Sequence, residues 1–367
     1  MKRFFYFMLI IALAFLTKPL WIDPVRELIP VSVSEQYHSM REFTIKWIDE
    51  HIDLNEIDDY LSLPHPTYPE QEQVEKPNLE IPENEIFSIG NIKLGDSKSD
   101  VAELYGESVR TSENEYGLKW STYHENYQNF IMVMYDEDET VQGLFTNQDM
   151  FVSQVDLVMG DTKETVRDAL GDPKDVLYYD EFGYQIDSGG EYDIYQMDNS
   201  IVTIFYDLHA GGEMTAIQLI AEELEMTKSN LYASGNEALR DGFEYQLFDL
   251  TNATRVNHGL NALVWDEGAR EPARAHSTDM AENQFFSHTN LADQTFSDRL
   301  IEAGITFRLA GENLAYGQFS SIFAHQGLMN SIGHRENILH SGFMKIGIGV
   351  DFNEQNHPFY TEKFFTD

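Results

Sequence analysis

The chain opens with an unbroken apolar run from Phe4 to Leu16, which follows the basic pair Lys2 and Arg3. A positive start followed by an apolar stretch is typical of an export signal. The run is shorter than the roughly 20 residues of a membrane-spanning helix, although further apolar residues reach position 22. No small-residue cleavage site follows, so residues 1–22 are predicted to be a signal peptide or a membrane anchor, with a buried core helix as the alternative. Export makes the rest of the chain extracytoplasmic, either secreted or held at the membrane.

Residues 23–85 show two patterns. In residues 34–50, apolar side chains recur at three- and four-residue spacing, which predicts an amphipathic helix. Residues 61–85 contain five prolines among acidic and polar residues. Prolines in that setting favour a stiff, extended chain. We therefore expect a helix and then a proline-rich acidic linker that holds the folded part away from the membrane.

A pattern of apolar residues and turns repeats between residues 86 and 225. The sequence from Ile92 to Lys98 has a close counterpart from Leu157 to Lys163, 65 residues later, and both contain a Gly-Asp-Ser/Thr turn. Each turn is expected to follow a short strand and to cap a helix that ends at a glycine. Alternating apolar residues then predict two strands in each copy, at 130–135, 141–145, 201–206 and 216–220.

The repeat predicts a pseudo-twofold α+β domain over residues 86–225. Its Asp-Ser/Thr turns are explained by helix capping, so they need no role as phosphate or metal loops. The sequence of this domain contains no catalytic constellation.

The C-terminal part alternates helices and strands differently. Residues 244–255 predict a helix that ends near Gly259, and Leu263 to Asp266 opens a second helix, within which Pro272 should cause a kink or shift the start. Two strands are expected near the C-terminus, at 346–350 and 359–364, and alternating glycines in the first favour a close approach of neighbouring backbone.

Composition narrows the classes of function. The formal charge of −39 argues against nucleic acid and against electrostatic docking on anionic lipid. From residue 228 to the end there are 10 Lys and Arg against 18 Asp and Glu, so most of the acidity lies before that point. A solvated acidic surface explains it, with a binding site for cations or for a basic wall polymer as the alternative. Cysteine is absent, which excludes thiol catalysis, disulfides and zinc–thiolate sites.

Seven of the twelve histidines lie in residues 236–367, among short motifs of fixed order. These motifs are Asn-x-x-Arg, Leu-x-Trp-Asp, His-Ser-x-Asp-Met, Phe-Phe-Ser-His, Gly-Glu-Asn-Leu-Ala, Asn-Ser-x-Gly-His-Arg-x-Asn-Ile-Leu and Gly-x-Gly-Val, running from Asn252 to Val350. Together they resemble the bacterial branch of the CAP superfamily (cysteine-rich secretory protein, antigen 5 and pathogenesis-related proteins; SCP-like). The resemblance implies that residues 236–367 form a three-layer α-β-α sandwich with a central cleft. The preceding repeat resembles the CAP-associated N-terminal domain of some spore-forming Gram-positive bacteria.

The resemblance also implies which residues line the cleft. Two histidines and two glutamates line it in many members and can bind a divalent metal such as zinc; His288, Glu312 and His334 match three of these positions. The fourth falls on Ser331, so a zinc site here would lack one ligand, and its histidines would have to be neutral. Ser331 and three further residues are expected to support the cleft: His276 as a hydrogen-bonded core histidine, and Asn313 and Asn337 as amides that hold the backbone.

Three functions stay open at this point. The first is a cell-envelope binding or signalling module whose ligand is a wall polymer, a lipid or a protein. The second is a metal-assisted hydrolase of wall polymers or secreted peptides, in which Glu312 would act as general base or ligand. The third assigns partner binding to the repeat domain. The missing fourth ligand favours the first.

Overall fold

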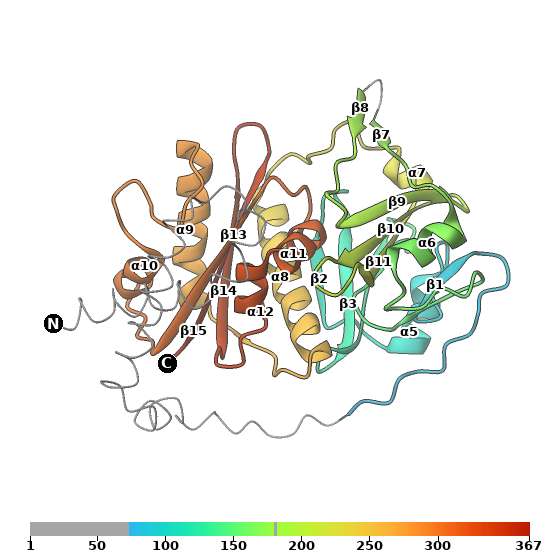
Figure 1. Ribbon diagram of the computed structural model, residues 1–367, viewed down its shortest axis with the longest axis horizontal. Coiled ribbons are helices and arrows are strands. Elements are labelled where there is room, and N and C mark those ends of the chain that lie inside the picture. Colours follow the sequence, from blue (N-terminus) through green and yellow to red (C-terminus); the bar gives the residue numbers. More distant parts are fainter. Residues whose placement is uncertain (1–72, 180–181) are drawn as a thin grey trace, which may run out of the picture. The chain divides into compact units, whose positions relative to one another are not determined.

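A computed structural model of the chain describes residues 73–179 and 182–367 (Figure 1). The predicted export segment at residues 1–22, the helix at 34–50 and most of the proline-rich linker lie outside these residues. Within the described residues, no helix combines the length and the apolar character that crossing a membrane requires. The described residues belong to one compact unit.

The repeat domain is built around an antiparallel sheet of seven strands in the order β2-β3-β4-β5-β11-β10-β9. These strands are β2 (Arg110–Glu113), β3 (Lys119–Glu125), β4 (Gln128–Tyr135), β5 (Val141–Thr146), β9 (Tyr192–Met197), β10 (Ser200–Asp207) and β11 (Glu213–Ala221). The last three strands of the two sequence copies meet at β5 and β11 in mirrored order. The first strands of the copies, β1 (Phe87–Ile89) and β6 (Phe151–Ser153), also pair with each other. A hairpin of β7 (Val176–Tyr179) and β8 (Phe182–Gln185) and the short helix α7 (Glu222–Glu225) complete the domain.

The helices of the two copies begin and end as the sequence predicts. Ser97 caps α5 (Lys98–Tyr105) and Thr162 caps α6 (Lys163–Leu170), each through its side-chain oxygen. Both helices end at a glycine with positive φ, at +71° and +84°, a conformation that costs glycine little. Val101 and Val166 bury the inner faces of these helices in one core.

The short strands expected before the two turns, at residues 92–94 and 157–159, are not formed. The strands β1 and β6 lie a few residues upstream instead. The reason is local, because the Asp96 carboxylate accepts a hydrogen bond from the Lys93 N–H and the Asp161 carboxylate from the Val158 N–H, both at 2.8 Å. A side chain that bonds the backbone three residues earlier closes a turn and takes the donor that a sheet would need.

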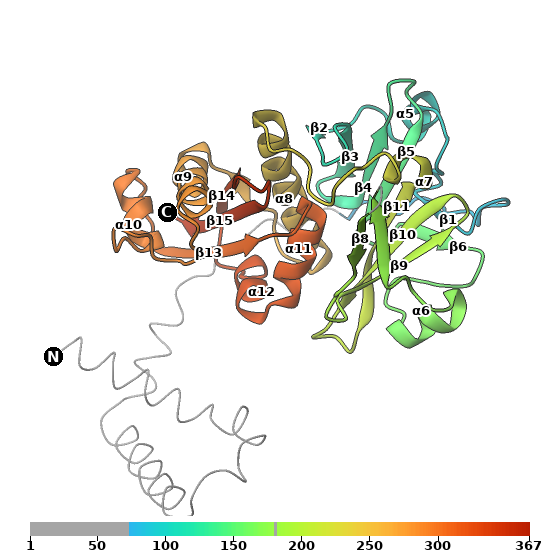
Figure 2. The same cartoon turned by 90° about the horizontal axis from the view of Figure 1, so that it is seen from above.

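The C-terminal domain is a three-layer sandwich (Figure 2). Its sheet has the order β12-β14-β15-β13, with α9 and α10 on one face and α8, α11 and α12 on the other. The elements are α8 (Glu237–Asn257), β12 (Val264–Trp265), α9 (Glu267–Asn283), α10 (Phe296–Glu302), β13 (Leu309–Tyr316), α11 (Ser321–Asn330), α12 (Ile332–Ile338), β14 (Lys345–Phe352) and β15 (Pro358–Thr366). The predicted α+β class with a C-terminal α-β-α sandwich is confirmed.

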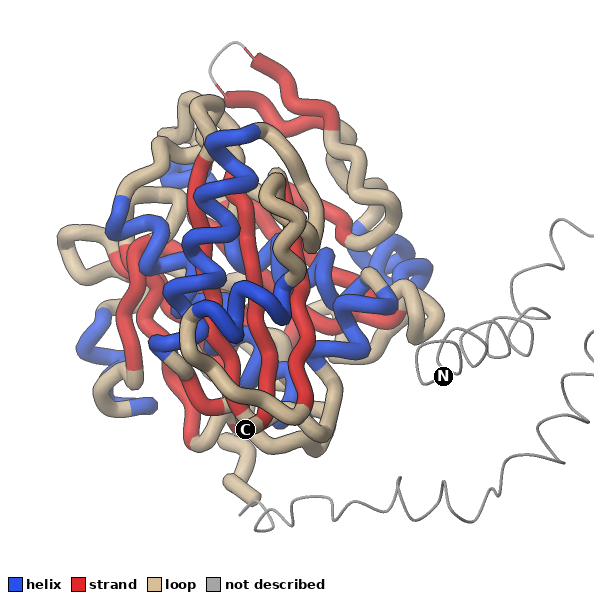
Figure 3. The backbone as a smooth tube through the Cα atoms, turned by 90° about the vertical axis from the view of Figure 1, so that its left-hand side faces the viewer, coloured by secondary structure: helices blue, strands red, loops and turns tan. Residues whose placement is uncertain are grey.

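Glycines on β14 explain how closely α9 packs against the sheet (Figure 3). A Cβ atom on Gly347 would overlap the backbone of Ala269, and one on Gly349 would overlap the backbone of Arg274. The alternate residues of β14 face α8 and are large and apolar. The helix α9 begins at Glu267, ahead of Pro272, so the expected shift of its start does not occur.

The helix α8 is buried on both sides. One side packs on β14, and the other packs on the sheet of the repeat domain, where Gln246 Nε2 donates to the Glu113 carbonyl at 2.8 Å and Arg110 Nε donates to Asp249 at 3.0 Å. A single apolar core spans the junction; it contains Trp120, Phe130, Met132, Met134, Phe145 and Phe205 from the repeat domain, and Leu250, Ala253, Ile322 and Phe323 from the C-terminal domain. The two domains therefore share part of their hydrophobic core.

Candidate functional site

Three separate elements carry the histidines and the glutamate that the sequence singles out. His288 lies in the loop after α9, Glu312 lies in the middle of β13, and His334 lies in the short helix α12. The Gly-Glu-Asn segment is thus part of a strand. The reason is that this whole segment pairs with β15, Glu312 directly opposite Lys363.

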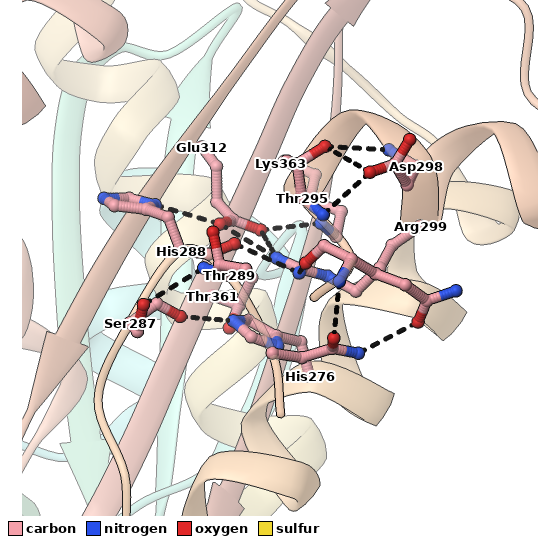
Figure 4. Close-up of polar contacts among 12 residues, drawn as sticks. His276, Ser287, His288, Thr289, Thr295, Asp298, Arg299, Glu312, Thr361 and Lys363 are labelled. Atoms are coloured by element: carbon pink, nitrogen blue, oxygen red, sulfur yellow. Dashed lines mark hydrogen bonds and ion pairs between the residues drawn. The ribbon is translucent and has the colours of Figure 1, made fainter. Parts of the chain in front are cut away.

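The Glu312 carboxylate is buried and receives three partners (Figure 4). His288 Nδ1 lies 3.0 Å from Oε1, while Arg299 Nη2 and Lys363 Nζ lie 2.8 and 2.6 Å from Oε2. Burial alone would raise the pKa of Glu312, but the bond to His288 and the charges of Lys363 and Arg299 outweigh it and lower the pKa to about 2. The carboxylate therefore stays ionised, and its bonds to three side chains give it a structural role.

His288 is held at one ring nitrogen and open at the other. Because the ionised Glu312 can only accept a hydrogen bond, Nδ1 of His288 carries the proton of this bond, and Nε2 is the ring nitrogen that Glu312 leaves free. The side chain is 53% exposed, and its ring lies apart from Arg299 and Lys363 (Figure 4). The Arg299 guanidinium also donates to the His288 carbonyl at 3.1 Å, which fixes the loop.

His334 is held in a similar way by Ser331. Ser331 occupies the N-cap position of the helix that carries His334, but its side chain makes no capping bond. Its hydroxyl lies 2.8 Å from His334 Nδ1 instead. Burial lowers the pKa of His334, and the nearby His288 lowers it further. The two imidazoles thus act on each other electrostatically, and both effects favour the neutral form of His334.

The fit of a divalent metal to these residues is incomplete. A catalytic zinc usually takes three protein ligands and a water. His288 and His334 offer two ring nitrogens, but Lys363 and Arg299 occupy the Glu312 oxygens, and Ser331 is turned to His334. In the part of the chain that the structure describes, no group of three or more His, Cys, Asp or Glu side chains is placed to hold a metal ion. Zinc binding stays a prediction.

The amides Asn313 and Asn337 lie on the opposite face of β13. Asn313 Nδ2 donates to the His334 carbonyl at 3.1 Å and to Glu362 Oε2 at 3.0 Å, and Asn337 Nδ2 donates to Asn313 Oδ1 at 2.9 Å. These bonds attach α12, and with it His334, to the centre of the sheet. Asn337 Nδ2 also donates to the Glu312 carbonyl at 3.3 Å, so each amide bonds directly to a backbone carbonyl.

His276 supports the loop that carries His288. It is 1% exposed, and its Nε2 donates to the Ser287 carbonyl at 2.9 Å. Burial, aided by the charge of Arg299, lowers its pKa to about 4, so the ring is neutral. It also lines, with Arg299, a neighbouring hollow of about 490 Å³ between α9 and α10.

Three charged residues of the site were not singled out from the sequence: Arg299, Glu362 and Lys363. The strand β15 did contain a signal, because Glu362 and Lys363 interrupt a run of aromatic and other large residues. Adjacent residues of a strand point to opposite faces. Two opposite charges in a buried strand therefore imply a separate partner on each face.

Glu362 gives a pH-dependent prediction. Its partners among the described residues are the uncharged Asn313 and Thr251, and burial raises its pKa from 4.5 to about 7, partly offset by these two hydrogen bonds. A raised folded pKa means that stability falls as the pH rises from about 4.5 to 7 and stays lower above that. Glu362→Gln should therefore stabilise the protein at pH 8 by on the order of 2–3 kcal/mol, with little effect at pH 4.5. Chemical denaturation of both proteins at the two pH values measures this; an equal effect at both would contradict it.

Comparisons with known proteins agree with this architecture. Residues 248–364 match the cysteine-rich secretory protein (CAP) family, and residues 94–231 match the CAP-associated N-terminal family. Two Bacillus subtilis (strain 168) proteins are similar: the uncharacterized membrane protein YlbC, 43% identical over 121 residues, and the uncharacterized protein YkwD, 37% identical over 122 residues. Each alignment covers 33% of this chain, and they cover 34% and 47% of those proteins, so the chain matches less than half the length of either.

Solved structures show the same fold over most of the chain. An extracellular protein containing a SCP domain from Bacillus anthracis str. Ames superposes with a TM-score of 0.65 at 24% identity, over 82% of this chain and all of that one. A cysteine-rich secretory protein from Staphylococcus aureus Mu50 superposes with a TM-score of 0.59 at 13% identity, over 75% of this chain and 94% of that one. The chain thus combines a CAP domain at residues 248–364 with a CAP-associated N-terminal domain before it at residues 94–231.

Proposed function

We propose that the chain is an extracytoplasmic binding or signalling module of the cell envelope, with His288 and His334 as its ligand-contacting groups. The observation that carries the proposal is the state of Glu312, whose carboxylate is held by Lys363, Arg299 and His288 at a pKa of about 2. A general base works best with a pKa near the working pH, so Glu312 is unsuited to that role. The His288 ring, fixed and exposed, is suited to recognition.

The location rests on the apolar N-terminal run and on two similar proteins. YlbC is named a membrane protein, and the Bacillus anthracis protein is named an extracellular protein. The same location for this chain agrees with the basic pair and apolar run at its start. The ligand is then a wall polymer, a lipid or a protein met outside the cytoplasm.

One observation favours a hydrolase as the second candidate. The Glu312 carboxylate orients the His288 ring through Nδ1 and leaves Nε2 outside that bond, an arrangement found when a histidine serves as general base. In this function His288 would take the proton of an attacking water, and Glu312 would only position the ring. The substrate would be a wall polymer or a secreted peptide.

One experiment separates the two functions. Purified full-length protein is incubated with isolated wall material, and both retained protein and released soluble fragments are measured. We expect retention without release, weakened about tenfold by His288→Ala. His340→Ala is the matched control, because it removes an exposed histidine of the same domain outside the site. Fragment release that depends on His288 would favour the hydrolase; neither retention nor release would refute both functions for wall material.

Metal content is a second test. Because the described residues offer two imidazole nitrogens and no third ligand beside them, we expect full-length protein dialysed after zinc loading to keep well under one zinc per chain. His334→Ala should leave this content unchanged. Elemental analysis by mass spectrometry gives the ratio. One zinc per chain, lost in both His288→Ala and His334→Ala, would contradict the expectation and favour metal-assisted hydrolysis.

A further inference from the structure

Four ring side chains from four separate segments form a connected strip beside His288. They are Tyr232 before α8, Phe286 in the loop after α9, Tyr316 at the end of β13, and His357 between β14 and β15. The ring centres lie 4.3 Å apart for Tyr232 and His357, 5.9 Å for Tyr316 and His357, and 6.1 Å for Phe286 and Tyr316. Phe286 is 51% exposed and Tyr316 is 42% exposed. We call these four residues the aromatic strip.

Three rings of the strip, those of Tyr232, Tyr316 and His357, are held in place by hydrogen bonds. The Tyr232 hydroxyl donates to the Gly317 carbonyl at 2.7 Å, and the Tyr316 hydroxyl lies 3.1 Å from His357 Nδ1. The Tyr316 ring also rests on the buried ring of Phe359, with centres 4.4 Å apart. Rings that are already fixed lose little side-chain freedom when a ligand covers them. Single exposed apolar residues need no explanation, but a connected, fixed group of them indicates a contact surface.

The strip continues from the candidate site. Phe286 is two residues from His288 in the same loop. Tyr316 lies four residues beyond Glu312 on β13, and because side chains alternate along a strand, the two are on the same face. A ligand that contacts His288 and the strip together is therefore extended along β13.

Charge and shape decide the class of this ligand. The strip contains no acidic or basic side chain apart from His357, in a chain whose net charge of −39 repels anionic polymers. In the strip, aromatic ring faces lie next to the hydroxyls of two tyrosines and the imidazole of His357. This arrangement suits a ligand whose flat faces are apolar and whose edges carry polar groups. Three hollows of about 330, 410 and 490 Å³ in the described residues are all lined by residues outside the strip. Phe286 and Tyr316 are also about half exposed, so the strip presents ring faces at the surface, whereas an acyl chain needs an apolar hollow.

From these observations we infer that the aromatic strip is a subsite for an uncharged polysaccharide strand, whose sugar rings lie against Phe286 and Tyr316. The inference rests on the proposed binding function and names its ligand class. The sugar faces cover the exposed rings, and the sugar hydroxyls bond to His288 and to the hydroxyls of the strip.

The test uses full-length protein and insoluble wall glycan from which peptides and anionic polymers have been removed. Phe286→Ala and Tyr316→Ala are each expected to raise the dissociation constant about tenfold. Tyr178→Ala is the matched control, because it removes a tyrosine that is 63% exposed on β7 of the repeat domain, and it should bind as the wild type does. Phe286 lies in a loop, so its variant keeps the test valid even if Tyr316→Ala fails to fold.

Two sets of results would overturn the inference. If soluble wall peptides or neutral phospholipid vesicles compete with wall binding and purified glycan does not, the ligand is a peptide or a lipid. If His288→Ala loses wall binding while both strip variants keep it, the proposed function stands and the strip has no part in it. Competition by glycan, together with selective loss in the strip variants, supports the inference.

Discussion

Replacing Glu312 with Gln is expected to destabilise the folded chain by about 3–5 kcal/mol at pH 7, the cost of leaving buried charges without their partner. Lys363, whose side chain is fully buried, lies 2.6 Å from the carboxylate, and Arg299 is nearly as buried. The amide of Gln cannot neutralise either cation. Chemical denaturation followed by circular dichroism measures the loss, and an unchanged midpoint would show that this ion cluster does not hold the fold.

A double variant checks the cause of that loss. In Glu312→Gln, the buried Lys363 ammonium is left without a carboxylate partner. Adding Lys363→Met removes this unpaired charge, so the double variant should regain part of the lost stability. Two residues in contact are not expected to give additive effects. If the double variant loses the sum of the two single effects, the charge argument is wrong.

The same carboxylate predicts how the free energy of unfolding changes at acidic pH. Its folded pKa lies below the ordinary value of 4.5, at about 2. The stability that it contributes is therefore complete above pH 4.5 and is lost as the pH falls towards 2. In Glu312→Gln this contribution is absent, so its stability should fall less steeply over that range than that of the wild type.

Replacing Gly242 with Ala is expected to destabilise the protein by about 1–3 kcal/mol or more, because the junction between the domains leaves no room for a methyl group. Gly242 lies in α8, where a Cβ atom would overlap the Glu113 carbonyl oxygen of β2. The helix would have to move away from the repeat domain and break the Gln246 bond to the same carbonyl. Denaturation and limited proteolysis report the loss of the junction.

Gly333→Ala is the matched control for Gly242→Ala. Gly333 is also a helical glycine, in α12, but no neighbouring atom lies within 4 Å of the position of its Cβ. Alanine there should stabilise the protein by about 0.5–1 kcal/mol through helix propensity. Effects of the same sign in both variants would mean that helix propensity, and not the tight junction, governs position 242.

Much of the fold could be predicted because its signals are local. The capping Ser97 and Thr162 and the terminal Gly106 and Gly171 act within one helical turn, so their positions in the sequence suffice. The alternating glycines of β14 likewise predicted a close approach of neighbouring backbone, and the backbone of α9 is that neighbour.

The partners of Glu312 could not be predicted in the same way. Arg299 lies 13 residues away and Lys363 lies 51 residues away, and no periodic pattern links them. The double burial of α8 was also hidden, since this helix contains Gln246 and Asp249, which look like residues of a solvent-facing side. Both are buried and bonded to the repeat domain, to Glu113 and Arg110 respectively. When the polar residues of a buried helix are bonded to specific partners, the sequence of the helix has the same pattern as that of a surface helix.

The apolar core shared across α8 and α11 limits how this protein can be dissected. A fragment that begins at residue 236 would lack the repeat domain, whose aromatic rings cover part of the shared core. Four apolar residues would then be exposed to water: Leu250, Ala253, Ile322 and Phe323. Such a fragment would tend to self-associate through this exposed apolar surface. Ligand screens and crystallisation trials should therefore keep both halves in one polypeptide.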